Sequence, residues 1–202
     1  MEEERAAPGR RMLLKQAATI AVATGLGLSF RQAQAAQAAP PPPSAGRARA
    51  PGKPGDFDWL SGEWRIRHRR LKTPGSDDWD EFEGEATCWG ILGGIAHVEE
   101  LRIPARDFAG MGLRLLDLDK RLWSDHWVNA KSGVLGAAGL TGSFEDGECV
   151  FEARDSEDGK AVIYRGVWDR IVRGKSHRWY QAASRDDGRT WDYTWFMDWT
   201  RA

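Results

Sequence analysis

The sequence contains few of the residues and motifs that identify an enzyme or a metalloprotein. It has two cysteines and four histidines in 202 residues. No histidine pair has the HxH or HExxH spacing, so the sequence assigns no metal site. It also contains no Gly-x-Ser-x-Gly nucleophile elbow, no CxxC pair and no glycine-rich dinucleotide loop. These absences leave no motif-based catalytic residue and no assigned cofactor.

The two cysteines are too few to form a disulfide framework. Cys88 and Cys149 lie in different parts of the chain, and no spacing rule pairs them. They form either one disulfide, which export from the cytoplasm would permit, or two separate buried thiols.

No apolar run is long enough to cross a membrane, but one near the N-terminus fits an export signal. Ala17–Phe30 spans about 14 residues, whereas a membrane helix needs about 20. The run follows the twin arginines Arg10 and Arg11, and two small-x-small cleavage sites lie within residues 33–38. The pattern predicts a twin-arginine signal peptide over residues 1–38.

A signal of this kind predicts where the protein acts. The twin-arginine route moves folded proteins, so we expect the chain to fold first and then to engage the twin-arginine translocase. The mature protein would be periplasmic or secreted. A general secretory signal, or an amphiphilic tail on a cytosolic protein, remain the alternatives.

The segment after the signal has the composition of a linker. Residues 39–55 are rich in proline, alanine and glycine and include Pro40–Pro43. Such a stretch buries too little apolar surface to offset chain entropy, which predicts a disordered tether. The folded part is then residues 56–202, about 147 residues and the size of one domain.

Charge and aromatic content limit the classes of partner that this domain can bind. Of the 29 Lys/Arg and 30 Asp/Glu, eight and three lie in residues 1–55, so the remainder is acidic. An acidic domain without a basic stripe argues against nucleic acid as a partner. All 11 tryptophans fall in the domain. They either line a cavity or fill a core.

Short alternating segments separated by turn residues predict an all-β domain. Ten such strands in an antiparallel up-and-down meander hide their edges best by closing into a barrel. The expected strands are residues 62–72, 79–89, 95–103, 109–117, 121–130, 137–145, 148–155, 160–171, 177–185 and 190–200.

The sequence of the first hairpin predicts how its two strands pair. A turn centred on Gly75 gives one charged outward face and one mostly apolar inward face that carries Trp64, Ile66 and His68. A shift by one residue would destroy both patterns. The opposed charged pairs are Arg69 with Glu81, Arg67 with Glu83, and Arg65 with Glu85.

Both ends of the predicted meander carry a known signature. Gly62 and Trp64 open the first strand as Gly-x-Trp, and Arg201 follows the last strand. This resembles the lipocalin and wider calycin signature, in which the arginine stacks on the tryptophan and plugs one end of the barrel.

A more specific resemblance covers nearly all of residues 56–202. The segments Asp56–Trp64, Trp79–Gly84, Leu92–Gly94 and Ser184–Trp191 are similar to a bacterial family of lipocalin-like barrels without an assigned activity. The resemblance therefore implies the fold and leaves the function open. The signal and the proline-rich tether depart from that family.

The candidate ligand contacts are inward-facing residues of the predicted barrel. We expect His68, Arg114, Tyr193 and Trp195 to reach the interior, with Arg114 as partner of whichever of Glu99-Glu100 faces inward. Some distant calycin-like barrels hold haem through one histidine, so His68 is the candidate axial ligand.

Three hypotheses follow. The favoured one is a binding protein for a small apolar or aromatic molecule. An enzyme using acid–base chemistry inside the barrel would bring at least two ionisable side chains within hydrogen-bond reach. A structural or interaction protein would have a filled barrel. The sequence does not decide whether the protein is an enzyme, although it favours binding, and the oligomeric state is undetermined.

Overall fold

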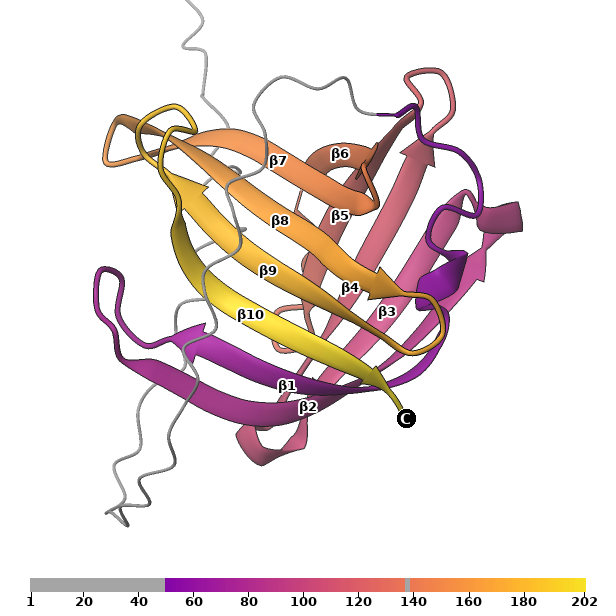
Figure 1. Ribbon diagram of the computed structural model, residues 1–202, viewed down its shortest axis with the longest axis horizontal. Helices are drawn as coiled ribbons and strands as arrows, with labels where there is room; N and C mark the ends of the chain where they lie inside the picture. Colours follow the sequence, from indigo (N-terminus) through magenta and orange to yellow (C-terminus); the bar gives the residue numbers. More distant parts are fainter. Residues whose placement is uncertain (1–49, 137–138) are drawn as a thin grey trace, which may run out of the picture.

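Ten antiparallel strands close into one up-and-down barrel (Figure 1). The computed structural model describes residues 50–136 and 139–202, so the predicted signal peptide, residues 1–38, and most of the predicted tether lie outside the described residues. Consecutive strands pair, and β1 closes the barrel against β10, which confirms the predicted fold class. The strands are β1 (Gly62–Leu71), β2 (Trp79–Ile91), β3 (Ala96–Ile103), β4 (Phe108–Asp117), β5 (Leu122–Asn129), β6 (Leu140–Glu145), β7 (Glu148–Glu157), β8 (Lys160–Val172), β9 (Ser176–Ser184) and β10 (Asp192–Arg201).

Short 3-10 turns are the helical elements of the described residues. They are η1 (Asp58–Leu60), η2 (Leu92–Gly94) and η3 (Pro104–Arg106). Among the described residues, no helix has the length and apolar character that a membrane crossing requires.

The first hairpin has the predicted register but a different set of ion pairs. The Cα partners of β1 and β2 match all three predicted pairs. The side chains reach further, however: Arg67 donates to Glu81 at 2.7 Å, and Glu85 accepts from Arg102 of β3 at 2.9 Å. Because long side chains bridge diagonal positions, the pairing extends over three strands instead of two.

One half of the barrel interior is densely packed, and η1 lies across its end. Phe57, which precedes η1, and Leu60, the last residue of η1, are 1% and 0% exposed. Inward side chains from β1, β5, β8 and β10 fill the space beneath them. We call this the packed half; its largest members are Trp64, Trp123, Trp168 and Trp199, each at most 1% exposed.

The arginine contact that the resemblance implies is present at this end. The Arg201 guanidinium carbon lies 5.0 Å from the ring centre of Trp64, and Nη1 donates to the Ser61 carbonyl at 2.7 Å. Gly62 adopts a φ of +125°, and a Cβ there would lie 2.1 Å from Nη2 of Arg201. The glycine is therefore required both for the backbone conformation and for the approach of the guanidinium.

The predicted tether differs from the structure in its last residues. The backbone N–H groups of Ala50, Gly52 and Gly55 donate to carbonyls of Phe144, Arg121 and Gly94 at 2.8–3.0 Å. Residues 50–55 are therefore bound to the barrel ends, and the ordered part begins before residue 56. Composition did not predict these contacts. The backbone N–H and C=O groups of a proline-rich stretch can hydrogen-bond to any strand end that lies nearby, whatever the side chains.

The prediction that Tyr193 faces the interior is wrong. β10 contains a bulge between Tyr193 and Trp195, where the register against β9 shifts by one residue. The extra residue turns Tyr193 to the outward side, where its ring lies 5.6 Å from Tyr180 and 5.7 Å from Phe196. Strict alternation along β10 predicts the opposite face, and nothing in the local sequence marks the bulge.

Candidate functional site

The half of the barrel interior away from η1 is lined by aromatic side chains that keep part of their surface accessible. Phe82, Phe108, Trp127 and Trp179 project inward from four strands and contact the core, yet each is only half-buried. Phe108 and Trp127 stack with their ring centres 6.3 Å apart. We call this the accessible half, in contrast to the packed half.

Glycines make room for these rings. A Cβ on Gly110 would lie 2.2 Å from the Trp127 ring, and one on Gly166 would lie 3.4 Å from Nε1 of Trp179. The tryptophans can therefore lie flat against the wall of the barrel. The glycine positions on β4 and β8 decide where the aromatic surface of the accessible half is placed.

A polar cluster lies where the two halves meet. Arg114 on β4 donates to Glu99 on β3 at 2.5 Å, and its Nη1 lies 3.4 Å from Nδ1 of His97. The guanidinium also lies 4.8 Å from the ring centre of Trp168. Glu99 is the inward member of the Glu99-Glu100 pair, so the structure joins the predicted acid to the predicted arginine.

Arg114, however, does not present its charge to the accessible half. It is 2% exposed, and Glu99 beside it is 4% exposed. One donor, Nε, has no hydrogen-bond partner among the described residues. Arg114 therefore neutralises a buried carboxylate, and a ligand would reach it only through another group.

Asp125 on β5 is the member of the cluster that keeps accessible surface. Its Oδ1 lies 3.7 Å from Nε of Arg114, and 20% of its side chain is accessible, compared with 3% for Arg114. Burial raises the pKa of the Asp125 carboxyl to about 6; Arg114 opposes the rise and Glu99 adds to it. A carboxyl that titrates near neutral pH and faces the interior is a candidate for binding or proton transfer.

His68 has a structural position that does not suit a haem ligand. It is fully buried, its ring stacks on Phe82 at 4.6 Å, and Nδ1 accepts a hydrogen bond from Nε1 of Trp195 at 3.2 Å. Burial lowers its pKa to about 3, with Arg106 and Arg70 contributing, so the ring is neutral.

The tautomer of His68 follows from these contacts. Because Nδ1 accepts, the single ring proton lies on Nε2, which then has no lone pair for iron. Nε2 also points at Gly84, where an added Cβ would lie only 2.5 Å away. The residues present therefore do not fit an axial haem site at His68.

Trp195 faces the interior as predicted, but it is only 9% exposed. Its indole N–H is bonded to His68, and the Arg70 guanidinium carbon lies 4.7 Å from its ring centre. Trp195 and His68 are thus buried parts of the interior. The accessible aromatic surface comes from side chains of other strands.

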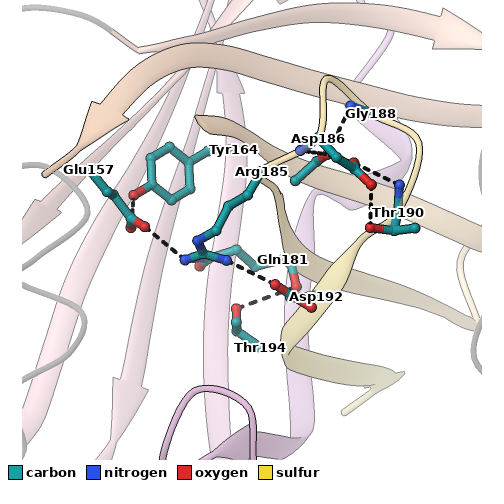
Figure 2. A network of polar contacts seen from close by, with 10 residues as sticks. Glu157, Tyr164, Gln181, Arg185, Asp186, Gly188, Thr190, Asp192 and Thr194 are labelled. Atoms are coloured by element: carbon teal, nitrogen blue, oxygen red, sulfur yellow. Dashed lines mark hydrogen bonds and ion pairs between the residues drawn. The ribbon is translucent and has the colours of Figure 1, made fainter. Parts of the chain in front are cut away.

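Charged side chains join two hairpins at the rim of the accessible half (Figure 2). Arg185 donates to Glu157 at 2.8 Å and to Asp192 at 2.9 Å, and the Tyr164 hydroxyl donates to Glu157. Burial and the bond to Glu157 raise the pKa of Tyr164. The network links the β7–β8 and β9–β10 hairpins at this rim.

The β9–β10 turn is stabilised from within (Figure 2). Asp186 accepts from the backbone and hydroxyl of Thr190 at 2.9 and 2.7 Å, and Ser184 donates to Asp186 at 2.8 Å. These bonds lower the pKa of Asp186 to about 2. The Ser184–Trp191 segment, singled out in the sequence, therefore serves the geometry of the turn.

Sequence reasoning missed Asp125, Trp127 and Trp179. Asp125 stands between Trp123 and Trp127 on the inward face of β5, an alternation that marks a carboxylate among indoles. That signal was available in the sequence. The closeness of Asp125 to Arg114 follows only from the pairing of β4 with β5.

Other groups of the described residues carry less chemistry. No three His, Cys, Asp or Glu side chains in residues 50–136 and 139–202 are grouped to hold a metal ion. Both cysteines are buried, and burial and nearby Glu99 raise the pKa of the Cys88 thiol. A pocket outside the packed half is lined by Pro51, Ser143 and Arg173, and the polar cluster does not open into it.

Comparison with known proteins does not show a family. No family model and no curated protein matches the sequence. A protein of unknown function of the DUF3598 family from Nostoc punctiforme is similar in structure, with 12% identity and a TM-score of 0.42. The match covers 78% of this chain and 53% of that chain, so this chain spans about half of that protein's length.

Proposed function

We propose that the protein binds a small apolar or aromatic molecule in the accessible half of the barrel interior. The observation that carries this proposal is the set of inward aromatic side chains that keep accessible surface in a closed barrel. A barrel built only for stability would bury such rings, as the packed half does. The ligand would lie against Trp127, Phe108 and Trp179.

Binding can be tested with the neutral fluorescent probe N-phenyl-1-naphthylamine. Because an indole wall contributes about 1–2 kcal/mol to an apolar ligand, Trp127→Ala and Trp179→Ala should each weaken binding about five-fold or more. Trp89→Ala is the matched control, since Trp89 is 42% exposed on the outward face of β2. Fluorescence titration would measure the three affinities. A probe that fails to bind, or equal loss in all three variants, would contradict the proposal.

Acid–base catalysis is a second candidate. Ionisable groups do converge in the interior, as an enzyme requires, and the pKa of Asp125 near 6 suits proton transfer. The buried Glu99, Arg114 and His97 cannot touch a substrate, which leaves one accessible titratable group in the cluster. Native mass spectrometry distinguishes the binding protein from the enzyme. A binding protein holds its ligand with an unchanged mass, whereas an enzyme converts it.

We further propose that residues 1–38 export the folded barrel, which would belong with the lipocalin-like proteins. The Arg10-Arg11 motif supports the first part, and the Gly62–Trp64–Arg201 contact supports the second. Replacing both arginines by lysine should retain the protein in the cytoplasm, while the unchanged signal places it in the periplasm. Fractionation followed by immunoblotting measures this; export of the Lys-Lys variant at the full level would argue for a general secretory signal.

A further inference from the structure

The polar cluster in the barrel interior has an unbalanced charge. It contains two carboxylates, Glu99 and Asp125, and one guanidinium, Arg114. His97 adds no charge, because burial and Arg114 lower its pKa to about 3. With Asp125 ionised, the cluster therefore has one negative charge in excess.

The excess charge lies on the one accessible member. Arg114 directs its short bond to Glu99 at 2.5 Å, while its Nε stays 3.7 Å from Asp125, beyond hydrogen-bond distance. Among the described residues, no donor hydrogen-bonds to the Asp125 carboxylate. Its oxygens therefore keep the capacity to accept a hydrogen bond from a ligand, and 20% of the side chain is accessible.

Aromatic side chains follow this carboxylate along the inward face of the barrel. Trp127 follows Asp125 on the same inward face of β5, and Phe108 stacks on Trp127. Indole and phenyl faces attract cations, and a carboxylate beside them adds a specific partner. Acid and rings together are typical of sites for organic ammonium groups.

We propose, building on ligand binding in the accessible half, that the ligand is a small apolar molecule bearing a protonated amine that pairs with Asp125. Its apolar body lies against Trp127 and Phe108. The ammonium group supplies the positive charge that the cluster lacks, so binding both satisfies Asp125 and neutralises the interior.

Ligands of other charge fit the cluster less well. An anionic head would meet Asp125 directly, because Arg114 is already neutralised by Glu99 and is 2% exposed. The cations nearer the rim are engaged elsewhere: Arg106 pairs with Asp80 at 2.7 Å, and Arg70 lies over Trp195. Neither arginine is among the charged groups that act on the pKa of Asp125, which are Arg114 and Glu99.

Three probes of one shape test the charge requirement. They are 2-phenylethylamine, 2-phenylethanol and 3-phenylpropionate, measured by calorimetry at pH 7.5 against the full mature chain. We expect the amine to bind about ten-fold or more tightly than the alcohol, and the acid to bind most weakly. Asp125→Asn should abolish the preference for the amine and leave the affinity for the alcohol within about two-fold. Glu83→Gln, which removes an exposed outward carboxylate, is the matched control.

The preference should also depend on pH. The amine stays protonated, whereas Asp125 gains a proton as the pH falls through about 6, so the preference should decline between pH 7.5 and pH 5. The charged groups facing Asp125 are Arg114 from β4 and Glu99 from β3, and its partner on β6 is Leu140. The preference in Glu83→Gln should follow the same curve as in the unaltered protein.

The outcomes separate this inference from the proposed function. If the alcohol binds but the amine binds no more tightly, or if the preference survives Asp125→Asn and Asp125→Ser, the amine inference is overturned and binding stands. If neither the three probes nor N-phenyl-1-naphthylamine binds, the proposed function itself fails. Binding of the alcohol to the Asn variant reports that its interior is intact.

Discussion

Asp125 shows at the scale of one residue how a site can oppose stability. Its pKa is raised from 3.8 to about 6, so the folded state disfavours the ionised form. The folded protein is thus relatively more stable below pH 4 and loses that advantage as the pH rises through 6. A residue that lowers stability at neutral pH and faces the interior is better explained by ligand binding than by folding.

This gives a prediction for stability. Asp125→Asn should raise the free energy of unfolding at pH 8 by on the order of 2 kcal/mol, because the neutral amide avoids the cost of a buried charge. The difference should vanish near pH 4, where Asp125 is protonated. Urea denaturation at the two pH values measures it, with Glu83→Gln as the control for removal of an exposed outward carboxylate. An Asn variant less stable than the unaltered protein at pH 8 would refute this account.

At the scale of strands, the inward face is organised by the alternation of glycine with large rings. Gly84 admits the ring of His68 from β1, and Gly110 admits Trp127 from β5. The hairpin register, the charged outward face of β1 and β2, and the inward position of Trp64 could all be predicted, because a period of two follows from the strand backbone.

The bulge in β10 shows where prediction from strand alternation fails. One extra residue after Tyr193 reverses its face, and the Tyr193 ring then packs outward against Tyr180 and Phe196. Tyr180 lies on β9, so the sequence of β10 by itself does not reveal this contact. Alternation therefore predicted Trp195 correctly and Tyr193 wrongly.

At the scale of the whole molecule, the closed barrel holds three histidines without charge. Burial lowers the pKa of His68, His97 and His177 from 6.5 to about 3. Their stabilisation is fully present above pH 6.5 and is lost as the pH falls toward 3. Asp125 acts in the opposite direction between pH 6 and 4, but one group does not offset three.

The barrel should therefore lose stability in mild acid. The free energy of unfolding should fall below pH 6.5, by up to about 1.4 kcal/mol per pH unit for each buried histidine. Neither ring nitrogen of His177 has a hydrogen-bond partner among the described residues, and four tryptophans surround it, so His177→Phe should fold and show a shallower pH dependence.

Urea midpoints between pH 7.5 and 5 measure this slope. His126→Gln is the control, because His126 is only half-buried and its pKa is lowered less strongly. It should leave most of the slope unchanged. A His177→Phe variant with the full slope would show that another group controls acid stability.

The sequence by its alternation predicted the ten-strand antiparallel barrel and the register of its first hairpin, because a period of two follows from the strand backbone. The contact of Trp64 with Arg201 was implied by the resemblance to the lipocalin signature. Only the tertiary structure decided which inward side chains remain accessible. Accessibility depends on how side chains from several strands share one enclosed volume. For that reason Arg114 and His68 are buried, whereas Asp125 and Trp127 keep accessible surface and form the candidate site.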